Sequence, residues 1–284
     1  MIEFRTVGLI AQKELRAALR NRWFVMFTVA FIGLALVLTS LLQPANSPLR
    51  IASYSRTTAS LINLVLLFVP LVGLTLGATN LVGDRETGVL AYLLAQPVTR
   101  EEVLLGKFTG LGAALIAAIA LGFGVAGLVL AAQGTAQSAG AYVLSVVLAG
   151  LLALAMLSVG FLLATLAGTT SAALGAGLLA WLGLVFVGDL GIMGTAVATQ
   201  MPLDVLFFTA VVNPLQMYKI AAILTIQANL EVLGPAGLYA TDVFGPGLLP
   251  LLVGGLLLWI VFPLAAALVV FSRQEKLGTK AGAK

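Results

Sequence analysis

Six stretches of roughly twenty residues contain no charged side chain, and they constrain the fold of this chain more than any other feature. They are Trp23–Leu42, Ala59–Val82, Leu111–Ala132, Ala141–Ala167, Ser171–Gly188 and Leu248–Phe271. A helix of about 20 apolar residues crosses the hydrocarbon core of a bilayer. The strands of a membrane barrel would instead alternate apolar and polar residues over about 10 positions. The sequence therefore predicts an all-α integral membrane protein with six transmembrane helices.

The overall composition supports this prediction. Hydrophobic residues make up 61% of the 284 positions and charged residues only 9%, and the mean hydropathy is +1.11. Soluble proteins carry about 25% charged residues. No soluble domain or internal repeat is apparent, so we interpret residues 1–284 as a single transmembrane domain.

The distribution of cations gives the predicted orientation. With the N-terminus inside, all but three of the 15 lysines and arginines fall in cytoplasmic segments. The three outside are Arg50, Arg56 and Lys219. Cytoplasmic loops of membrane proteins carry such an excess of positive charge. We therefore expect both termini, and the loop between the second and third spans, on the cytoplasmic side.

Residues 1–22 have the pattern of an amphipathic helix that lies at the membrane interface. Its apolar stripe, with spacings of three and four, consists of Phe4, Val7, Ala11, Leu15 and Ala18. The opposite side carries Arg5, Lys13, Arg16 and Arg20. Its basic groups are favoured near anionic headgroups. Two roles suit such a helix: a solvated leader for the first span, or a connecting helix that lies along the membrane and touches a cytoplasmic subunit.

The outer segment, residues 190–247, lies between the fifth and sixth spans. Its apolar run, Val205–Val212, is too short to cross a bilayer. A seventh span here would move the cations after Phe271 to the outside, against the charge rule. We therefore predict short helices at the outer surface. The pattern leaves open whether residues 204–228 dip back into the membrane.

The charged segment, residues 83–107, interrupts the apolar pattern, and it contains seven charged residues. The sequence predicts a first helix here over Asp84–Gln96. Asp84 and Glu86 would lie in its first turn, where the helix dipole favours negative charge. One side of this helix is apolar, with Val89, Leu90, Leu93 and Leu94.

A proline break and a capped second helix are predicted to follow. Pro97 ends the first helix, because proline disfavours helical backbone in the residue before it. Thr99 and Glu102 form the pattern of a capping box that starts the next helix. The apolar side of the first helix needs a covering surface. A partner subunit would supply it, or the protein's own N-terminal helix if this is an ordinary structured hairpin.

Residues that are missing from the chain exclude several classes of function. Cysteine and histidine are absent, which removes thiolate metal sites and the commonest proton shuttle. The six spans contain no charged residue, whereas ion-coupled carriers and intramembrane aspartyl hydrolases need ionisable groups at membrane depth. The six methionines form no cluster in the sequence, so a copper channel is disfavoured.

Two further patterns predict how the spans pack. Gly73-x-x-x-Gly77 and Gly106-x-x-x-Gly110 allow close helix approach within the chain. Hydrogen bonding between helices is the expected use of the polar residues in the spans. These residues are Asn63, Thr75, Asn80 and Thr165.

The charged segment resembles the coupling-helix signature of ABC exporter permeases of the second bacterial type. The motifs that carry this resemblance are Asp84-x-x-x-Gly88, Leu93-Leu94, Pro97-x-Thr99-Arg100 and Gly106-Lys107. The entry into the first span is also similar, through Lys13-Glu14-Leu15 and Arg20-Asn21-Arg22-Trp23. Within this family the chain most resembles permeases of nitrous oxide reductase maturation. The motifs that carry this closer resemblance are Asn213-Pro214 with Tyr218, and Trp259-Ile260-x-x-Pro263-Leu264.

The resemblance implies a permease of the bacterial inner membrane that has no ATPase site of its own. A separate cytoplasmic ATPase would bind ATP and Mg²⁺, and this chain would bind no cofactor or metal. The residues expected to dock on that ATPase are Asp84, Arg85, Glu86, Gly88, Leu90, Leu93, Leu94, Pro97, Thr99, Arg100 and Lys107.

Further partners implied by the resemblance are a second copy of the chain in a homodimer and a periplasmic β-helix protein that handles copper. Membrane lipid is a partner as well, and nucleic acid is not. The implied function is to couple ATP hydrolysis to export or to mechanical signalling in the maturation of nitrous oxide reductase. The alternatives are export of a lipophilic compound and a non-transporting scaffold for a periplasmic complex.

Overall fold

A computed structural model describes residues 3–41, 50–132, 139–188, 202–227, 240 and 242–281. The α-helices are α1 (Phe4–Arg20), α2 (Arg22–Leu41), α3 (Arg50–Glu86), α4 (Val89–Leu94), α5 (Arg100–Ala132), α6 (Ala139–Leu166), α7 (Thr170–Phe186), α9 (Leu203–Val212), α10 (Pro214–Gln227) and α12 (Leu248–Ala281), with a 3₁₀ turn η3 (Gly245–Gly247). These ranges contain no strand. The predicted all-α class is confirmed for this part of the chain.

Among the residues that the structure describes, five helices are long and apolar enough to cross a membrane. They contain the first, second, third, fourth and sixth predicted spans, within α2, α3, α5, α6 and α12. The predicted fifth span corresponds to α7, which is apolar but has only 17 residues, a length of about 25 Å. The hydrocarbon core is about 30 Å thick. A crossing by α7 therefore stays a prediction.

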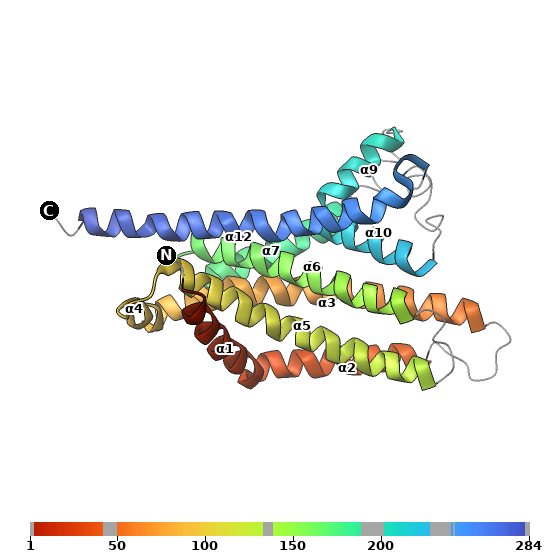
Figure 1. Cartoon of the computed structure of the whole chain (residues 1–284), viewed down its shortest axis with the longest axis horizontal. Helices are drawn as coiled ribbons and strands as arrows, with labels where there is room; N and C mark the ends of the chain where they lie inside the picture. The colour runs from red at the N-terminus through yellow and green to blue at the C-terminus, as the bar shows by residue number, and fades with distance from the viewer. Residues whose placement is uncertain are drawn as a thin grey trace.

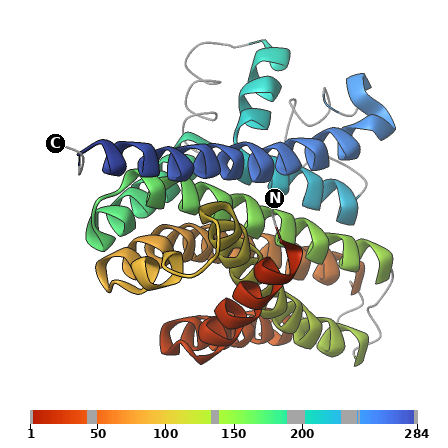
Figure 2. The same ribbon diagram turned by 60° about the vertical axis from the view of Figure 1, so that its left-hand side comes forward.

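The helices form one bundle whose two ends differ. Helices α1 and α4 and the C-terminal end of α12 lie at one end, whereas α9 and α10 lie at the other (Figure 1). Helix α12 and helix α2 lie on opposite sides of the bundle (Figure 2), and α6 packs against α3, α5, α10 and α12. The segments predicted to be cytoplasmic, 1–22 and 83–107, thus share one end. The side of the membrane that this end faces stays a prediction.

Glycines fix the contact between α3 and α6 at the centre of the bundle. A Cβ atom on Gly160 would lie 2.6 Å from the carbonyl oxygen of Leu74, and one on Gly77 would lie 2.6 Å from that of Leu157. Because real Cβ atoms do not approach other atoms within 3.0 Å, the two helices pack backbone to backbone here. The motif that begins at Gly73 is therefore a packing motif within the chain, as predicted.

Helices α9 and α10 form a bent pair with an angle of 110° between them. Asn213 occupies the bend. Its side-chain oxygen accepts the N–H of Leu215 at 2.9 Å, and its side-chain amide donates to the carbonyl of Leu184 in α7 at 2.6 Å. The Trp259 indole of α12 donates to the carbonyl of Val212 at 3.2 Å. Two short helices thus occupy part of the predicted outer segment. Its residues 190–201, 228–239 and 241 lie outside the described ranges.

The contact between α3 and α6 generates a stability prediction. We expect Gly160→Ala to lower the melting temperature of the purified protein, because the added Cβ would force the two backbones apart. Overpacking of this kind costs about 1–3 kcal/mol. The matched control is Gly124→Ala in α5, where no atom lies within 4 Å of the new Cβ. Tryptophan fluorescence melts in detergent measure both, and equal melting temperatures would refute the backbone contact.

Candidate functional site

The charged segment 83–107 begins inside α3 rather than in a helix of its own. Helix α3 continues to Glu86, and Gly88 follows with a φ of +78°. Glycine adopts this left-handed conformation without a steric penalty, and it commonly ends helices there. Helix α4 then covers only Val89–Leu94. The prediction of one helix over Asp84–Gln96 is therefore wrong, because Gly88 divides it.

The same division corrects the predicted places of Asp84 and Glu86. They lie in the last turn of α3, where the helix dipole disfavours negative charge. Glu86 is compensated at the start of α7, since its carboxylate accepts the N–H of Thr170 at 2.9 Å and also the hydroxyl of that residue. Arg85 donates to the carbonyl of Ala167 at 3.4 Å. The end of α3 therefore holds the turn between α6 and α7.

The second helix of the segment is capped as predicted. The Glu102 N–H donates to Thr99 Oγ1 at 3.3 Å, and the Thr99 N–H donates to Glu102 Oε2 at 2.8 Å. This reciprocal pair is a capping box. The other carboxylate oxygen of Glu102 accepts the N–H of Glu3 at 2.7 Å. Glu102 thus joins the start of α1 to the start of α5, a connection that the sequence pattern did not predict.

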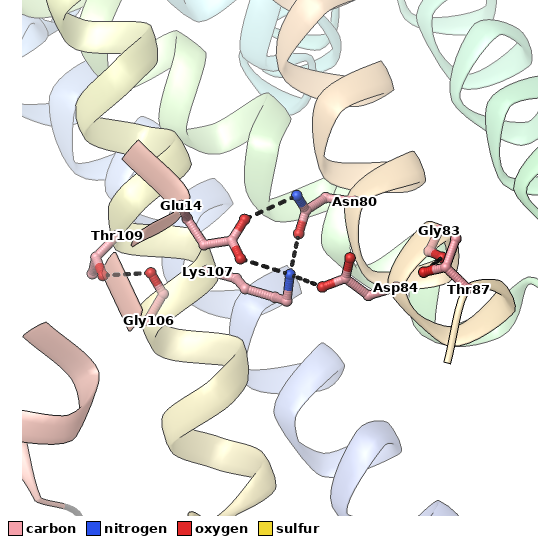
Figure 3. A network of polar contacts seen from close by, with 8 residues as sticks. All are labelled: Glu14, Asn80, Gly83, Asp84, Thr87, Gly106, Lys107 and Thr109. Atoms are coloured by element: carbon pink, nitrogen blue, oxygen red, sulfur yellow. Dashed lines mark hydrogen bonds and ion pairs between the residues drawn. The ribbon is translucent and has the colours of Figure 1, made fainter. Parts of the chain in front are cut away.

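A buried ion-pair cluster lies where α1, α3 and α5 meet (Figure 3). Lys107 Nζ is 2.5 Å from Asp84 Oδ2, 3.1 Å from Glu14 Oε1 and 2.9 Å from Asn80 Oδ1. The Asn80 amide also donates to Glu14 Oε2 at 3.2 Å, which confirms its predicted hydrogen bonding between helices. The Lys107 side chain is fully buried and that of Glu14 is 6% exposed. We call these four residues the Lys107 cluster.

Two glycines let α1 approach α5 closely enough to form this cluster. A Cβ atom on Gly106 would lie 2.6 Å from Cβ of Ile10. One on Gly110 would lie 2.4 Å from the carbonyl oxygen of Ala11 and 2.8 Å from Cβ of Glu14. The two helices therefore touch at the backbone, and this contact brings the Glu14 carboxylate to the ammonium group on α5. The second predicted glycine motif is the surface on which α1 lies.

The packed face of α1 differs from the predicted apolar stripe. Its buried residues are Ile10, Glu14 and Ala18. Phe4, which the stripe included, is 88% exposed because it lies at the free end of the helix. Glu14 takes an inward position because Lys107 compensates its charge. The predicted apolar stripe excluded Glu14 because it is charged, so its burial was not predicted.

The residues predicted to dock on a partner differ in exposure. Leu90 and Lys107 are buried. Half-buried are Asp84, Arg85, Leu93, Leu94 and Arg100, and exposed are Glu86, Gly88, Pro97 and Thr99. The Arg100 guanidinium lies 5.2 Å from the centre of the Phe271 ring in α12. Tyr92, which the prediction omitted, is the most exposed large side chain of α4, at 71%.

A cavity of about 170 Å³ lies toward the opposite end of the bundle, between α3, α7 and α10. Asn63 and Gln216 are the polar residues of its lining, and leucine and valine residues supply the rest. Within the part of the chain that the structure describes, no three His, Cys, Asp or Glu side chains gather to hold a metal ion.

The Lys107 cluster predicts a large effect of removing its cation. Lys107→Met leaves two carboxylates without their partner, and breaking a buried ion pair in this way costs about 3–5 kcal/mol. We expect a clear loss of thermal stability, which is partly restored when Glu14→Gln and Asp84→Asn are added. Lys13→Met, at an exposed position of α1, is the control that should change little. A single Lys107→Met variant as stable as this control would contradict the assignment.

Comparison with known proteins agrees with this arrangement. Residues 9–276 match the family described as ABC-2 family transporter protein. The chain is 31% identical over 271 residues to the probable ABC transporter permease protein NosY of Stutzerimonas stutzeri, which covers 93% of this chain and 97% of that protein. It is 33% identical over 220 residues to the protein of the same name from Pseudomonas aeruginosa, over 75% of this chain and 80% of that protein. The chain therefore belongs to the ABC-2 family of transporter permeases.

Proposed function

We propose that this permease couples ATP hydrolysis on a separate cytoplasmic subunit to export or mechanical signalling across the bacterial inner membrane, in the maturation of nitrous oxide reductase. Membership of the family implies an ABC ATPase partner. The chain contains no Gly-x-x-x-x-Gly-Lys-Ser/Thr motif, so that partner would bind ATP and Mg²⁺. The name NosY of the two relatives supports the connection to nitrous oxide reductase.

The Lys107 cluster is the observation that carries this proposal, because two of its members flank the short helix α4 in the sequence. Asp84 precedes α4 by five residues on α3, and Lys107 follows it on α5. A displacement of α4 would therefore act on two helices that the cluster joins. Because Glu14 binds the same ammonium group, α1 would move with them. The three helices can transmit the motion as one body.

The outward side of α4 has the properties of a docking surface. Tyr92 is 71% exposed and Val89 is 37% exposed, whereas Leu90 is buried against the bundle and Leu94 packs on its core. The helix is thus held from behind and presents an aromatic ring outward. Exposed tyrosine is enriched at protein interfaces. A groove on the ATPase would receive this side.

Two contacts would carry the motion beyond α1, α3 and α5. Glu86 binds Thr170 at the start of α7, so α7 follows the end of α3. Arg100 lies over the ring of Phe271, so α12 is tied to the start of α5. Helix α12 in turn holds the bend between α9 and α10 through its Trp259. A periplasmic copper-handling β-helix protein would bind at that end, and a second copy of the chain would complete the transporter.

Export of a lipophilic compound is the second candidate function. The cavity between α3, α7 and α10 favours it, because leucine and valine residues line it together with Asn63 and Gln216. Such a lining suits a small apolar molecule with one hydrogen-bonding group. ATP hydrolysis without any export would instead favour mechanical signalling.

Substitution of Tyr92 tests the proposed docking surface. We expect Tyr92→Glu, and Leu93→Glu with Leu94→Glu, to abolish co-purification of the ATPase and the stimulation of its activity by the permease. Charge in an apolar groove is unfavourable. The matched control is Val243→Glu at the opposite end, where the side chain is 55% exposed.

The measurement is the ATPase activity of the reconstituted complex, together with a melting curve for each variant. Tyr92→Glu should melt like the unchanged protein because the side chain touches little of its own chain. Stimulation that survives in a folded Tyr92→Glu variant would refute docking through α4. A complex that forms but never hydrolyses ATP would favour the scaffold alternative.

A further inference from the structure

Helix α12 runs along the bundle from the end with α9 and α10 to the end with α1 and α4 (Figure 1). Pro263 lies near the middle of this helix. Because proline has no N–H, the carbonyl of Trp259, four residues earlier, receives no hydrogen bond within the helix. Sharp bends in long helices occur at such points. The hydrogen-bond ladder of α12 is therefore interrupted over residues 259–263.

A serine of the neighbouring helix supports α12 at this interruption. Ser158 of α6 is fully buried, and its hydroxyl donates to the carbonyl of Ile260 at 2.6 Å. In membrane proteins, serine and threonine side chains supply hydrogen bonds to backbone that a proline has disrupted. Ser145, the other serine of α6, donates instead to the carbonyl of Ala141 in its own helix. Ser158 thus fixes α12 on α6 at the interruption.

The two halves of α12 are attached to different parts of the bundle. Before the interruption, Met217 of α10 packs on Gly255, where an added Cβ atom would lie 2.6 Å from Cε of the methionine. The Trp259 indole holds the bend between α9 and α10. After the interruption, the ring of Phe271 lies beside the guanidinium of Arg100 at the start of α5. Each half would therefore follow a different neighbour.

The outward side of α12 leaves room for a bend. Leu258, Val261 and Phe262 are 68%, 61% and 75% exposed, so they contact little of the described chain. Helix α6 packs along the inward side. A stiff α12 could therefore move only together with α6, whereas a bent one could tilt one half and leave the other in place.

We propose that α12 contains a hinge at residues 259–263, with the hydrogen bond from Ser158 as its pivot. The half that holds α9 and α10 tilts at this hinge while the other half stays on α5. The inference rests on the proposed function for the source of the motion, which is the ATPase. The hinge itself belongs to this chain and can be measured without the partner.

Hydrogen–deuterium exchange of the full-length permease measures the hinge. Pro263→Ala restores one N–H to the ladder, so the backbone amides of residues 264–267 should exchange about fivefold more slowly than in the unchanged protein. Pro250→Ala is the matched control, because Pro250 lies in the first turn of α12, where N–H groups have no helical partner. Equal exchange rates in the unchanged protein and both variants would overturn the hinge.

Substitution of Ser158 tests the pivot. We expect Ser158→Ala to speed exchange at residues 264–267 and to lower the melting temperature, because the interrupted ladder loses a donor. The effect should be smaller when Pro263→Ala is also present, since the ladder is then intact. Ser145→Ala is the control with a hydroxyl that bonds within its own helix. An effect of Ser158→Ala that matches this control, or that Pro263→Ala leaves unchanged, would contradict the pivot.

The complete transporter tests what the hinge does. In the unchanged complex, ATP should alter exchange in residues 203–227, which cover α9 and α10. Pro263→Ala should abolish this response while the ATPase stays bound, because Pro263 is not on the docking helix α4. A response that survives in Pro263→Ala would overturn the proposal. Hydrolysis without any response in the unchanged complex would instead refute mechanical signalling, and the exchange rates of the permease alone would still decide the hinge.

Discussion

One ammonium group that is shared by two carboxylates holds together the end of the bundle that contains α1 and α4. Transfer of a lysine from water into a protein interior costs several kcal/mol, and Lys107 is fully buried. The cost is offset by Glu14, Asp84 and Asn80, which come from two other helices. Glu14 is 93 positions away in the sequence. Helices α1, α3 and α5 cannot separate without leaving charge unpaired in an apolar environment, so the rest of the account depends on this interaction.

The carboxylates of the charged segment serve mainly to build this end of the molecule. Asp84 binds Lys107, Glu86 binds Thr170, and Glu102 binds the backbone of Glu3 and of Thr99. Three of the four carboxylates in the segment are thus used within the chain, and Glu101 is exposed. The segment also presents the exposed side of α4 outward, with Tyr92 at its centre. Glycine contacts between α1 and α5 and between α3 and α6 connect this framework to the core of the bundle.

Patterns that depend on near neighbours could be predicted from the sequence. The capping box of Thr99 and Glu102 and the close packing at both glycine motifs were predicted and are present. Of the six predicted spans, five correspond to helices of sufficient length and hydropathy in the described part of the chain. Contacts between distant residues could not be predicted. The docking set included Lys107, which is buried, because nothing near it in the sequence indicates that Glu14 will reach it. Gly88 was treated as a helical residue, although its left-handed φ divides the predicted helix. This signal was local, because glycine commonly ends helices in this conformation, and the prediction did not use it.

The most direct test of the account is a spin-label distance between α1 and the end of α3 in the complete transporter. The chain has no cysteine, so Gln12→Cys and Thr87→Cys, both at exposed positions, give one pair of labels in each copy of the chain. The account predicts a narrow distribution that is the same with and without ATP, and a broadened one when Lys107→Met is added. Two results would contradict the claim that these helices move as one body. One is a distance that changes on addition of ATP while Lys107 is present. The other is a distance distribution that stays equally narrow in the Lys107→Met variant.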